Sequence, residues 1–308
     1  MFKRLFGKKP DRRTPSPEPP DLSRAGLTSL FGVGGVRETT NVVLTRMPTL
    51  VDTATRFGGV PGYLEATAWP RCPSCKDPMM FVGQVEMGPA QPLRYPRPAI
   101  LYIFLCQSDP TAEPSCETWS PASGCAAVFA QEGVATTLRP PTEDFVDRAR
   151  VAELVADAHA RPDPARWELL DRRGHKDHHT TLFGQYACAF RSELSVCGQP
   201  IDGITRTQAH YAAMAALSKD RAMFIGGFPD WVQGPSSARC ACGKAMESVL
   251  QFGAFDEALN LGDAGEAYVL ACPDRCAPSS FALEWQSCES SDQRIGIRHG
   301  GEEPQARG

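Results

Sequence analysis

The sequence lacks any apolar run of the roughly 18 or more residues that a membrane-spanning helix needs. Its opening stretch, MFKRLFGKK, lacks the apolar core of a signal peptide. The chain also has little net charge, formally -4, so composition gives no reason to expect a nucleic-acid partner, which would need a basic face or stripe. We therefore expect a cytoplasmic protein with no membrane span.

The short motifs of common catalytic folds are absent as well. The sequence contains no G-x-S-x-G, no Walker loop and no G-x-G-x-x-G, so acyl-transfer and nucleotide chemistry have no recognisable starting point. His175, His178 and His179 crowd the stretch GHKDHH, and three imidazoles can hold a catalytic metal with an open position. Nothing in the spacing forces the rings to converge, and a hydrated loop is the simpler interpretation. A metal-dependent enzyme using residues 175–179 is the alternative function.

Cysteine, in contrast, is abundant, with 12 in the chain. Cytoplasmic thiols stay reduced, so short paired spacings indicate metal binding more than disulfides. Each half of the chain offers two close pairs separated by roughly thirty residues, and a zinc site closed by four thiolates needs two such pairs brought together by the fold. The candidate ligands are Cys72, Cys75, Cys106 and Cys116 in the first half and Cys240, Cys242, Cys272 and Cys276 in the second.

Three questions about these cysteines stay open at the level of sequence. The first pair of the second half is C-x-C, one residue shorter than the usual C-x2-C knuckle, which leaves open whether the second set binds metal. The expected number of structural zinc ions is therefore one or two. Free cysteine is also among the most buried residue types, so packing is the alternative role for both sets. Cys125 is an alternative to Cys116 as the fourth ligand, while Cys188, Cys197 and Cys288 are expected to be packing residues.

The sequence also contains an internal repeat, in which one unit occurs twice. A glycine pair, a proline, an aromatic residue, a cysteine and a glutamine recur at nearly the same separations in the two halves. Such internal self-similarity is considered before other evidence for the fold. The first copy contains Gly58, Gly59, Pro61, Tyr63, Cys75, Gln84, Tyr102 and Trp119, and the second contains Gly226, Gly227, Pro229, Trp231, Cys242, Gln251, Tyr268 and Trp285.

Local patterns divide the chain into five segments. Residues 1–25 are cationic and proline-rich and are expected to be a flexible tail, too short for stable membrane anchoring, and residues 291–308 a polar tail. Residues 26–135 and 179–290 are the two units, in which MMFVGQVEM, AILYIFLC and HTTLFGQYACAF read as strands. Residues 136–178 have helical periodicity and form the connector, and TQAHYAAMAALSKD predicts a further helix. The predicted fold class is α+β and β-rich, with two pseudo-repeated antiparallel-sheet units joined by a helical segment.

The repeated turns and glutamines form a candidate partner site. A GG-x-P sequence marks a tight turn in which Gly takes positive φ, and its bare backbone also lets another chain approach. A glutamine in an apolar strand needs a hydrogen-bond partner, either in its own neighbouring turn or in the backbone of an extended client segment. The predicted partner-binding residues are Gly58, Gly59, Tyr63, Gln84, Gly226, Gly227, Trp231 and Gln251.

This ordered series resembles a known superfamily. The series consists of GG-x-P-x-[YW], C-x2-C followed by a Met, the Gln of FVGQV, and Y-x3-C followed by a Trp. In this order the motifs resemble those of a superfamily that joins the YwqG-like proteins of bacteria to the eukaryotic programmed cell death protein 2 and its pre-ribosomal-RNA-processing relatives. The resemblance covers residues 50–130 and 180–288. The bacterial branch commonly has a His before the glycine stretch, where this chain has Met223 and Phe224.

The resemblance implies a β-rich fold built from a duplicated unit, with zinc knuckles and a role in protein binding. The eukaryotic relatives are dedicated chaperones of a small-subunit ribosomal protein. We therefore expect a zinc-stabilised protein-binding or chaperone-like module, not an enzyme, that captures an extended segment of a protein client such as a ribosomal protein or a component of a bacterial conflict system.

Overall fold

The computed structural model describes residues 20–47, 53–107, 116–143, 182, 184–197, 207–218, 223–256 and 258–288. The histidine stretch at residues 175–179, most of the predicted connector, the polar tail and most of the cationic tail lie outside these ranges. Nothing described here tests the predicted domain boundaries.

Strands dominate the described residues. The two described α-helices are α1 (Arg24–Phe31) and α4 (Gln208–Ser218), and a single 3-10 turn, η1, spans Val33–Gly35. The strands are β1 (Val36–Arg46), β2 (Arg56–Gly58), β3 (Met80–Gly88), β4 (Leu93–Arg94), β5 (Ala99–Leu105), β6 (Ala126–Glu132), β7 (Gln185–Val196), β8 (Met223–Gly226), β9 (Glu247–Gly253), β10 (Glu266–Ala271) and β11 (Phe281–Gln286). The β-rich class and the strands predicted from MMFVGQVEM and AILYIFLC are confirmed by β3 and β5.

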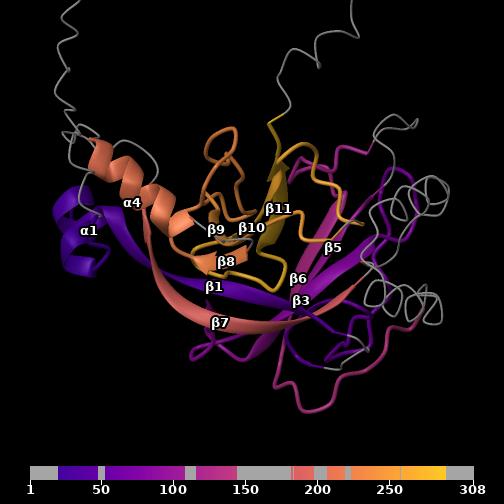
Figure 1. The fold of residues 1–308 in the computed structure, drawn as a ribbon. Helices are drawn as coiled ribbons and strands as arrows, with labels where there is room; N and C mark the ends of the chain where they lie inside the picture. Colours follow the sequence, from indigo (N-terminus) through magenta and orange to yellow (C-terminus); the bar gives the residue numbers. More distant parts are fainter. Residues whose placement is uncertain are drawn as a thin grey trace, which may run out of the picture.

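All strands belong to one sheet. Its order is β11-β10-β9-β8-β1-β7-β2-β3-β5-β6, and β4 pairs with β3 outside this path. Every pairing is antiparallel except that of β3 with β4. The end strands β6 and β11 contact each other, and the backbone N–H of Ala130 in β6 donates to the Pro278 carbonyl just before β11 at 3.0 Å. The antiparallel sheet is therefore nearly closed (Figure 1).

The long strands β1 and β7 occupy the centre of this order and pair along their whole length. β1 comes early in the chain yet pairs with β8, while β7 comes late and pairs with β2. Each half of the sequence thus supplies a central strand to the other half. Within the described residues the strands form one continuous sheet where two sheet units were predicted, because local sequence patterns specify strands but not which edges meet.

The sheet buries apolar residues on both faces. Along β5, Leu101 and Ile103 join a core that also includes Val269 and Phe252 of the second half, so both halves share that core. The alternate β5 positions, among them Tyr102, face a second cluster that contains Tyr63, Trp69, Cys72, Cys106, Cys116 and Cys125. A strand buried on both faces reads as a continuous apolar run, as AILYIFL does.

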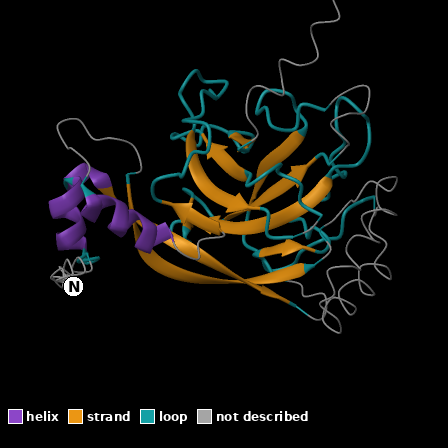
Figure 2. Ribbon diagram, turned by 45° about the horizontal axis from the view of Figure 1, so that its top comes forward, coloured by secondary structure: helices purple, strands orange, loops and turns teal. Residues whose placement is uncertain are grey.

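The two helices lie together at one end of the β1–β7 pair (Figure 2). Leu27 and Phe31 of α1 and Ala213 of α4 pack with Val36 and Val196 at the outer ends of the two strands. The helix predicted from TQAHYAAMAALSKD is confirmed by α4. In the described part of the chain, neither helix has the length and apolar character needed to cross a bilayer.

Candidate metal centres

The first cysteine set converges as predicted. Cys72 and Cys75 lie in the loop before β3, Cys106 directly follows β5, and Cys116 lies between β5 and β6. The four sulfur atoms all lie within 4.8 Å of one another. The Cys72 and Cys116 sulfurs are 3.6 Å apart, and those of Cys75 and Cys106 are 3.7 Å apart. This group is called the inner tetrad below.

A tight turn aims the first two thiols of the inner tetrad at the same point. The Cys72 N–H donates to the Asp77 carbonyl at 2.9 Å, and the Lys76 N–H donates to the Cys72 carbonyl at 3.0 Å. Lys76, directly after Cys75, has a positive φ of 68°. The reversal needed to bring a knuckle's two sulfurs together is therefore built into the backbone.

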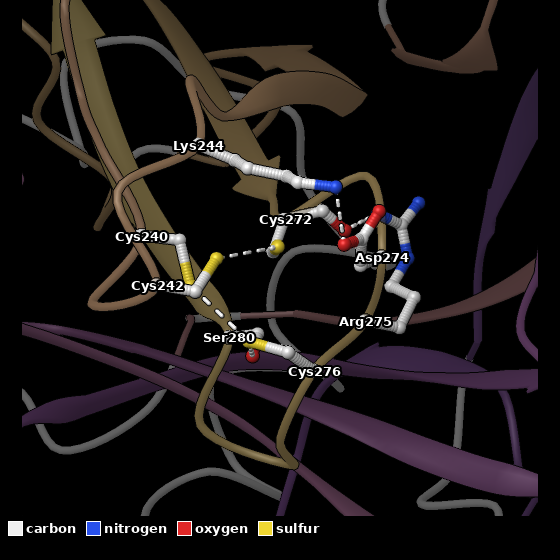
Figure 3. A network of polar contacts seen from close by, with 8 residues as sticks. All are labelled: Cys240, Cys242, Lys244, Cys272, Asp274, Arg275, Cys276 and Ser280. Atoms are coloured by element: carbon white, nitrogen blue, oxygen red, sulfur yellow. Dashed lines mark hydrogen bonds and ion pairs between the residues drawn. The ribbon is translucent and has the colours of Figure 1, made fainter.

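The second cysteine set also converges (Figure 3). Its four sulfur atoms lie within 4.8 Å of one another, with 3.5 Å between Cys240 and Cys276 and 3.6 Å between Cys242 and Cys272. Gly243, directly after Cys242, has a positive φ of 88°, and its N–H donates to the Cys240 carbonyl at 2.8 Å. The turn at C-x-C is one residue shorter than the C-x2-C turn of the inner tetrad, yet both of its thiols still lie close to those of Cys272 and Cys276. This group is called the outer tetrad.

The two tetrads differ in their surroundings. In the inner tetrad only Cys75 is partly exposed, whereas in the outer tetrad Cys242 and Cys276 are exposed. Burial raises the pKa of the Cys72 and Cys75 thiols. The backbone N–H of Cys242, followed by the Cys276 thiol, lowers the pKa of Cys240 to about 6. Because burial opposes thiolate formation in the inner tetrad, a cation is needed there to hold four thiolates.

Two cationic side chains, Lys244 and Arg275, lie beside the outer tetrad. The Lys244 ammonium lies 2.5 Å from an Asp274 carboxylate oxygen, and the Arg275 guanidinium donates to the Cys272 carbonyl (Figure 3). Hydrogen bonding to Asp274 raises the pKa of Lys244, and the charges of Cys242 and Cys272 raise it further. The Lys244–Asp274 pair is neutral overall, so Arg275 supplies the net positive charge beside this group of thiols.

The structure also decides between the two candidates for the fourth inner ligand. The Cys125 sulfur lies 3.7 Å from that of Cys72 and 3.7 Å from the Ser74 hydroxyl, yet it is not part of the set whose sulfurs are all mutually close. Cys116 completes that set. All 12 cysteines are free, and the sulfur separations within the tetrads far exceed the roughly 2.05 Å of a disulfide bond.

The structure does not bring the predicted partner-binding residues together in one open groove, because the first-copy members Gln84 and Tyr63 are buried. Gln84 is fully buried; its Oε1 accepts from the Gly62 N–H at 2.8 Å and its Nε2 donates to the Ala54 carbonyl at 3.1 Å. Gln251 accepts from the Asp230 N–H at 2.9 Å. Tyr63 is also fully buried. Each glutamine therefore secures its own neighbouring turn, as the simpler alternative predicted.

Tyrosines tie down the same turns, a role that sequence reasoning missed. The Tyr102 hydroxyl accepts from the Leu64 N–H at 3.2 Å and donates to the Gly62 carbonyl at 3.0 Å. The Tyr268 hydroxyl accepts from the Val232 N–H at 3.1 Å and donates to the Asp230 carbonyl at 2.8 Å. Tyr102 lies opposite Gln84 and Tyr268 opposite Gln251 on adjacent strands, and the only signal in the sequence was that both residues recur at matching positions of the repeat.

The glycine pairs make the expected turns. Gly58, Gly59, Gly226 and Gly227 all have positive φ, between 68° and 75°. At Gly58 a Cβ atom would lie 2.0 Å from the Gly184 carbonyl oxygen, so this glycine is required by packing as well as by φ. Trp231 is half-buried and its ring lies 4.3 Å from that of Tyr268. The first-copy glycines are buried within the fold, whereas Gly226 is exposed and Gly227 is partly buried.

Glu266 is a further residue that the sequence did not single out. Burial raises its pKa to about 7, from an ordinary value of 4.5, while a hydrogen bond from Gln251 works in the opposite direction. A raised carboxyl pKa means that the folded state binds the proton more tightly than the unfolded chain. Acidification through that range therefore increases the stability contributed by Glu266, and its charged form costs stability at higher pH.

We expect Glu266→Gln to be more stable than the wild type at about pH 8 and to lose that advantage by about pH 5, since glutamine removes the charge whose burial is unfavourable. Thermal melts of both proteins across this range measure the difference, and the comparison cancels any common effect of acid on the thiols. A difference between the two proteins that does not change with pH would contradict the assignment.

His175, His178 and His179 lie outside the described residues, so the enzyme alternative remains a prediction. No curated protein matches the chain. A family model described as a domain of unknown function, DUF1963, matches residues 55–288, which include both tetrads and ten of the eleven strands. Because this match spans more than half of the sequence, the chain belongs to the DUF1963 family.

Proposed function

We propose that this protein is a protein-binding, chaperone-like module whose sheet is stabilised by two structural zinc ions. The observation that carries the proposal is the sulfur geometry of the tetrads. A tetrahedral zinc ion with Zn–S bonds of about 2.3 Å holds its sulfurs about 3.8 Å apart. The shortest separations in both tetrads, 3.5 to 3.7 Å, are close to that edge length.

The ligand set favours zinc in a structural role. Four soft thiolates in a tetrahedral arrangement suit zinc, and a single iron ion is the main competitor for such a site. A centre closed by four protein ligands leaves no position for water or substrate, which distinguishes it from catalytic zinc. Zinc there contributes folding energy instead of chemistry. A reducing compartment such as the cytoplasm keeps these thiols available as ligands.

The protein-binding part of the proposal has two supports. The Gln84–Tyr102 and Gln251–Tyr268 pairs secure their turns by the same hydrogen bonds, which favours the duplicated unit of the YwqG-like and programmed cell death protein 2 superfamily. Membership of the DUF1963 family is consistent with that relationship. The client we propose is a protein that presents an extended segment to this module.

Affinity capture from native cells tests the binding role. The full chain, tagged and prepared without chelator, is expected to retain one abundant protein at a fixed ratio to itself through stringent washing. A matched sample of Cys242→Ser, which lacks an exposed outer ligand, reports whether capture needs the outer metal. Absence of any stoichiometric protein from repeated captures with the wild type would contradict the proposed function.

A further inference from the structure

The strand β7 has a partly unpaired edge. On one side it pairs with β1 from Tyr186 to Val196, and the Gln185 carbonyl accepts from the Met47 N–H just after β1. On the other side only residues 185–187 pair, with β2, and no described strand follows beyond Ala187. In Figure 1, β7 runs below β1 along the lower side of the sheet.

The backbone groups on this edge can be assigned from the register. The Cys197 N–H donates to the Gly35 carbonyl at 2.9 Å, and the Met47 N–H donates to the Gln185 carbonyl at 2.7 Å. Hydrogen-bonded and non-hydrogen-bonded pairs alternate along an antiparallel ladder, so odd-numbered β7 residues bond to β1. Even-numbered residues therefore direct their N–H and C=O groups to the other side.

Tyr186 is even-numbered, and it lies opposite Phe57 of β2, on the side of β7 away from β1, as this rule requires. The next outward-facing positions are Cys188, Phe190 and Ser192. Their N–H and C=O groups face the side of β7 on which no described strand lies. Together they offer three donors and three acceptors in a row, which is the pattern that an added strand completes.

Side-chain exposure shows that this part of β7 is uncovered on both faces. Residues 189–192 are all exposed, although successive side chains of a strand point to opposite faces. Phe190 is 42% exposed on one face, and Arg191 is exposed on the other. The β1–β7 ladder has no bulge here, and the stretch contains no proline, so two common protections of a sheet edge are missing.

We propose that residues 188–192 of β7 are the place where an extended segment of a client protein adds to the sheet as a further strand. This inference rests on the proposed binding function and supplies the site that the predicted groove does not. Phe190 favours an apolar residue beside it in the added strand. Arg191, which forms no ion pair within the described part of the chain, favours an acidic residue on the opposite face. The client segment therefore alternates apolar and acidic residues.

A labelled synthetic peptide that alternates valine and glutamate tests this geometry by fluorescence anisotropy. Two derivatives carry backbone N-methyl groups, one on its valines and the other on its glutamates. An added strand bonds to β7 through every second residue, so one derivative is expected to bind at least about tenfold more weakly while the other binds as before. Equal binding by both, or loss of binding by both, would overturn the edge pairing.

Variants of the full-length protein test the same contact from the other side. Ser192→Pro removes an outward N–H that the β1 ladder does not use, and Ser192→Ala is the matched control that keeps it. We expect the proline variant to lose at least about tenfold in peptide affinity and the alanine variant to lose none. Circular dichroism and zinc content show whether each variant is folded.

A charge reversal provides a test that does not depend on the proline variant folding. Arg191→Glu is expected to weaken binding of the valine–glutamate peptide and to strengthen binding of a valine–lysine peptide. If Arg191→Glu leaves the preference between the two peptides unchanged, the assigned edge is wrong. The remaining alternative is that a second copy of this protein occupies the β7 edge. Sedimentation tests it: if the wild type is a dimer and Ser192→Pro dissociates that dimer, a second copy fills the edge and the client assignment is overturned.

The outcome of client capture distinguishes this inference from the proposed function. If folded Ser192→Pro captures the native client as well as the wild type does, the edge proposal fails and the binding function stands. If the wild type captures no client, the proposed function itself fails.

Discussion

Replacing Cys72 with serine is expected to remove one zinc ion from the protein and to abolish cooperative folding around the inner tetrad. Structural zinc contributes on the order of 10 kcal/mol in small sites, which is comparable to the whole stability of a typical domain, about 5 to 15 kcal/mol. The Cys72 sulfur is buried and lies 3.6 Å from that of Cys116. Elemental analysis and thermal unfolding of protein prepared without chelator measure the two effects.

Two matched variants make this prediction sharp. Cys125→Ala changes a fully buried thiol 3.7 Å from the Cys72 sulfur but outside the tetrad, so we expect it to keep both zinc ions. Cys242→Ser is expected to lose the outer zinc with a smaller fall in melting temperature, because two outer ligands are exposed and less apolar structure depends on them. Wild-type protein that contains no zinc, or loss of zinc from Cys125→Ala, would contradict the assignment.

Asp256→Ala is expected to destabilise the protein by about 4 kcal/mol, the second largest effect, because it leaves several buried donors without an acceptor. The Asp256 carboxylate lies between β9 and β10 and is buried. It accepts from the Gly184 N–H at 2.9 Å, the Tyr186 hydroxyl at 2.8 Å and the Ala258 N–H at 3.0 Å. One side chain thus connects the start of β7 to the loop between β9 and β10.

Graded substitutions at this site separate the contacts. Asp256→Asn keeps one acceptor oxygen and is expected to cost less than alanine, and Tyr186→Phe removes one donor without stranding a charge and is expected to cost about 1 kcal/mol. Chemical denaturation of the zinc-loaded variants gives the free energies of unfolding. If Asp256→Ala costs no more than Tyr186→Phe, the carboxylate does not hold these elements together.

Much of the local structure followed from the sequence alone. The apolar runs MMFVGQVEM and AILYIFLC specified β3 and β5, and the pattern of TQAHYAAMAALSKD specified α4, because strand and helix periodicity depend on residues close together in the chain. The eight tetrad cysteines were also identifiable, since each close pair sits on a turn or at a strand end, where backbone geometry is set locally. Positive φ at the four paired glycines followed from the same local rule.

Only the tertiary structure decided the contacts between distant residues. The register of β1 against β7 replaced two predicted sheets with one, and it also left residues 188–192 with an unpaired edge. The choice of Cys116 over Cys125 depended on angstrom-scale differences among thiols that sequence spacing does not resolve. Gln84 was expected to face a client and instead bonds to its own turn, because a buried amide satisfies itself with whichever backbone groups folding brings near.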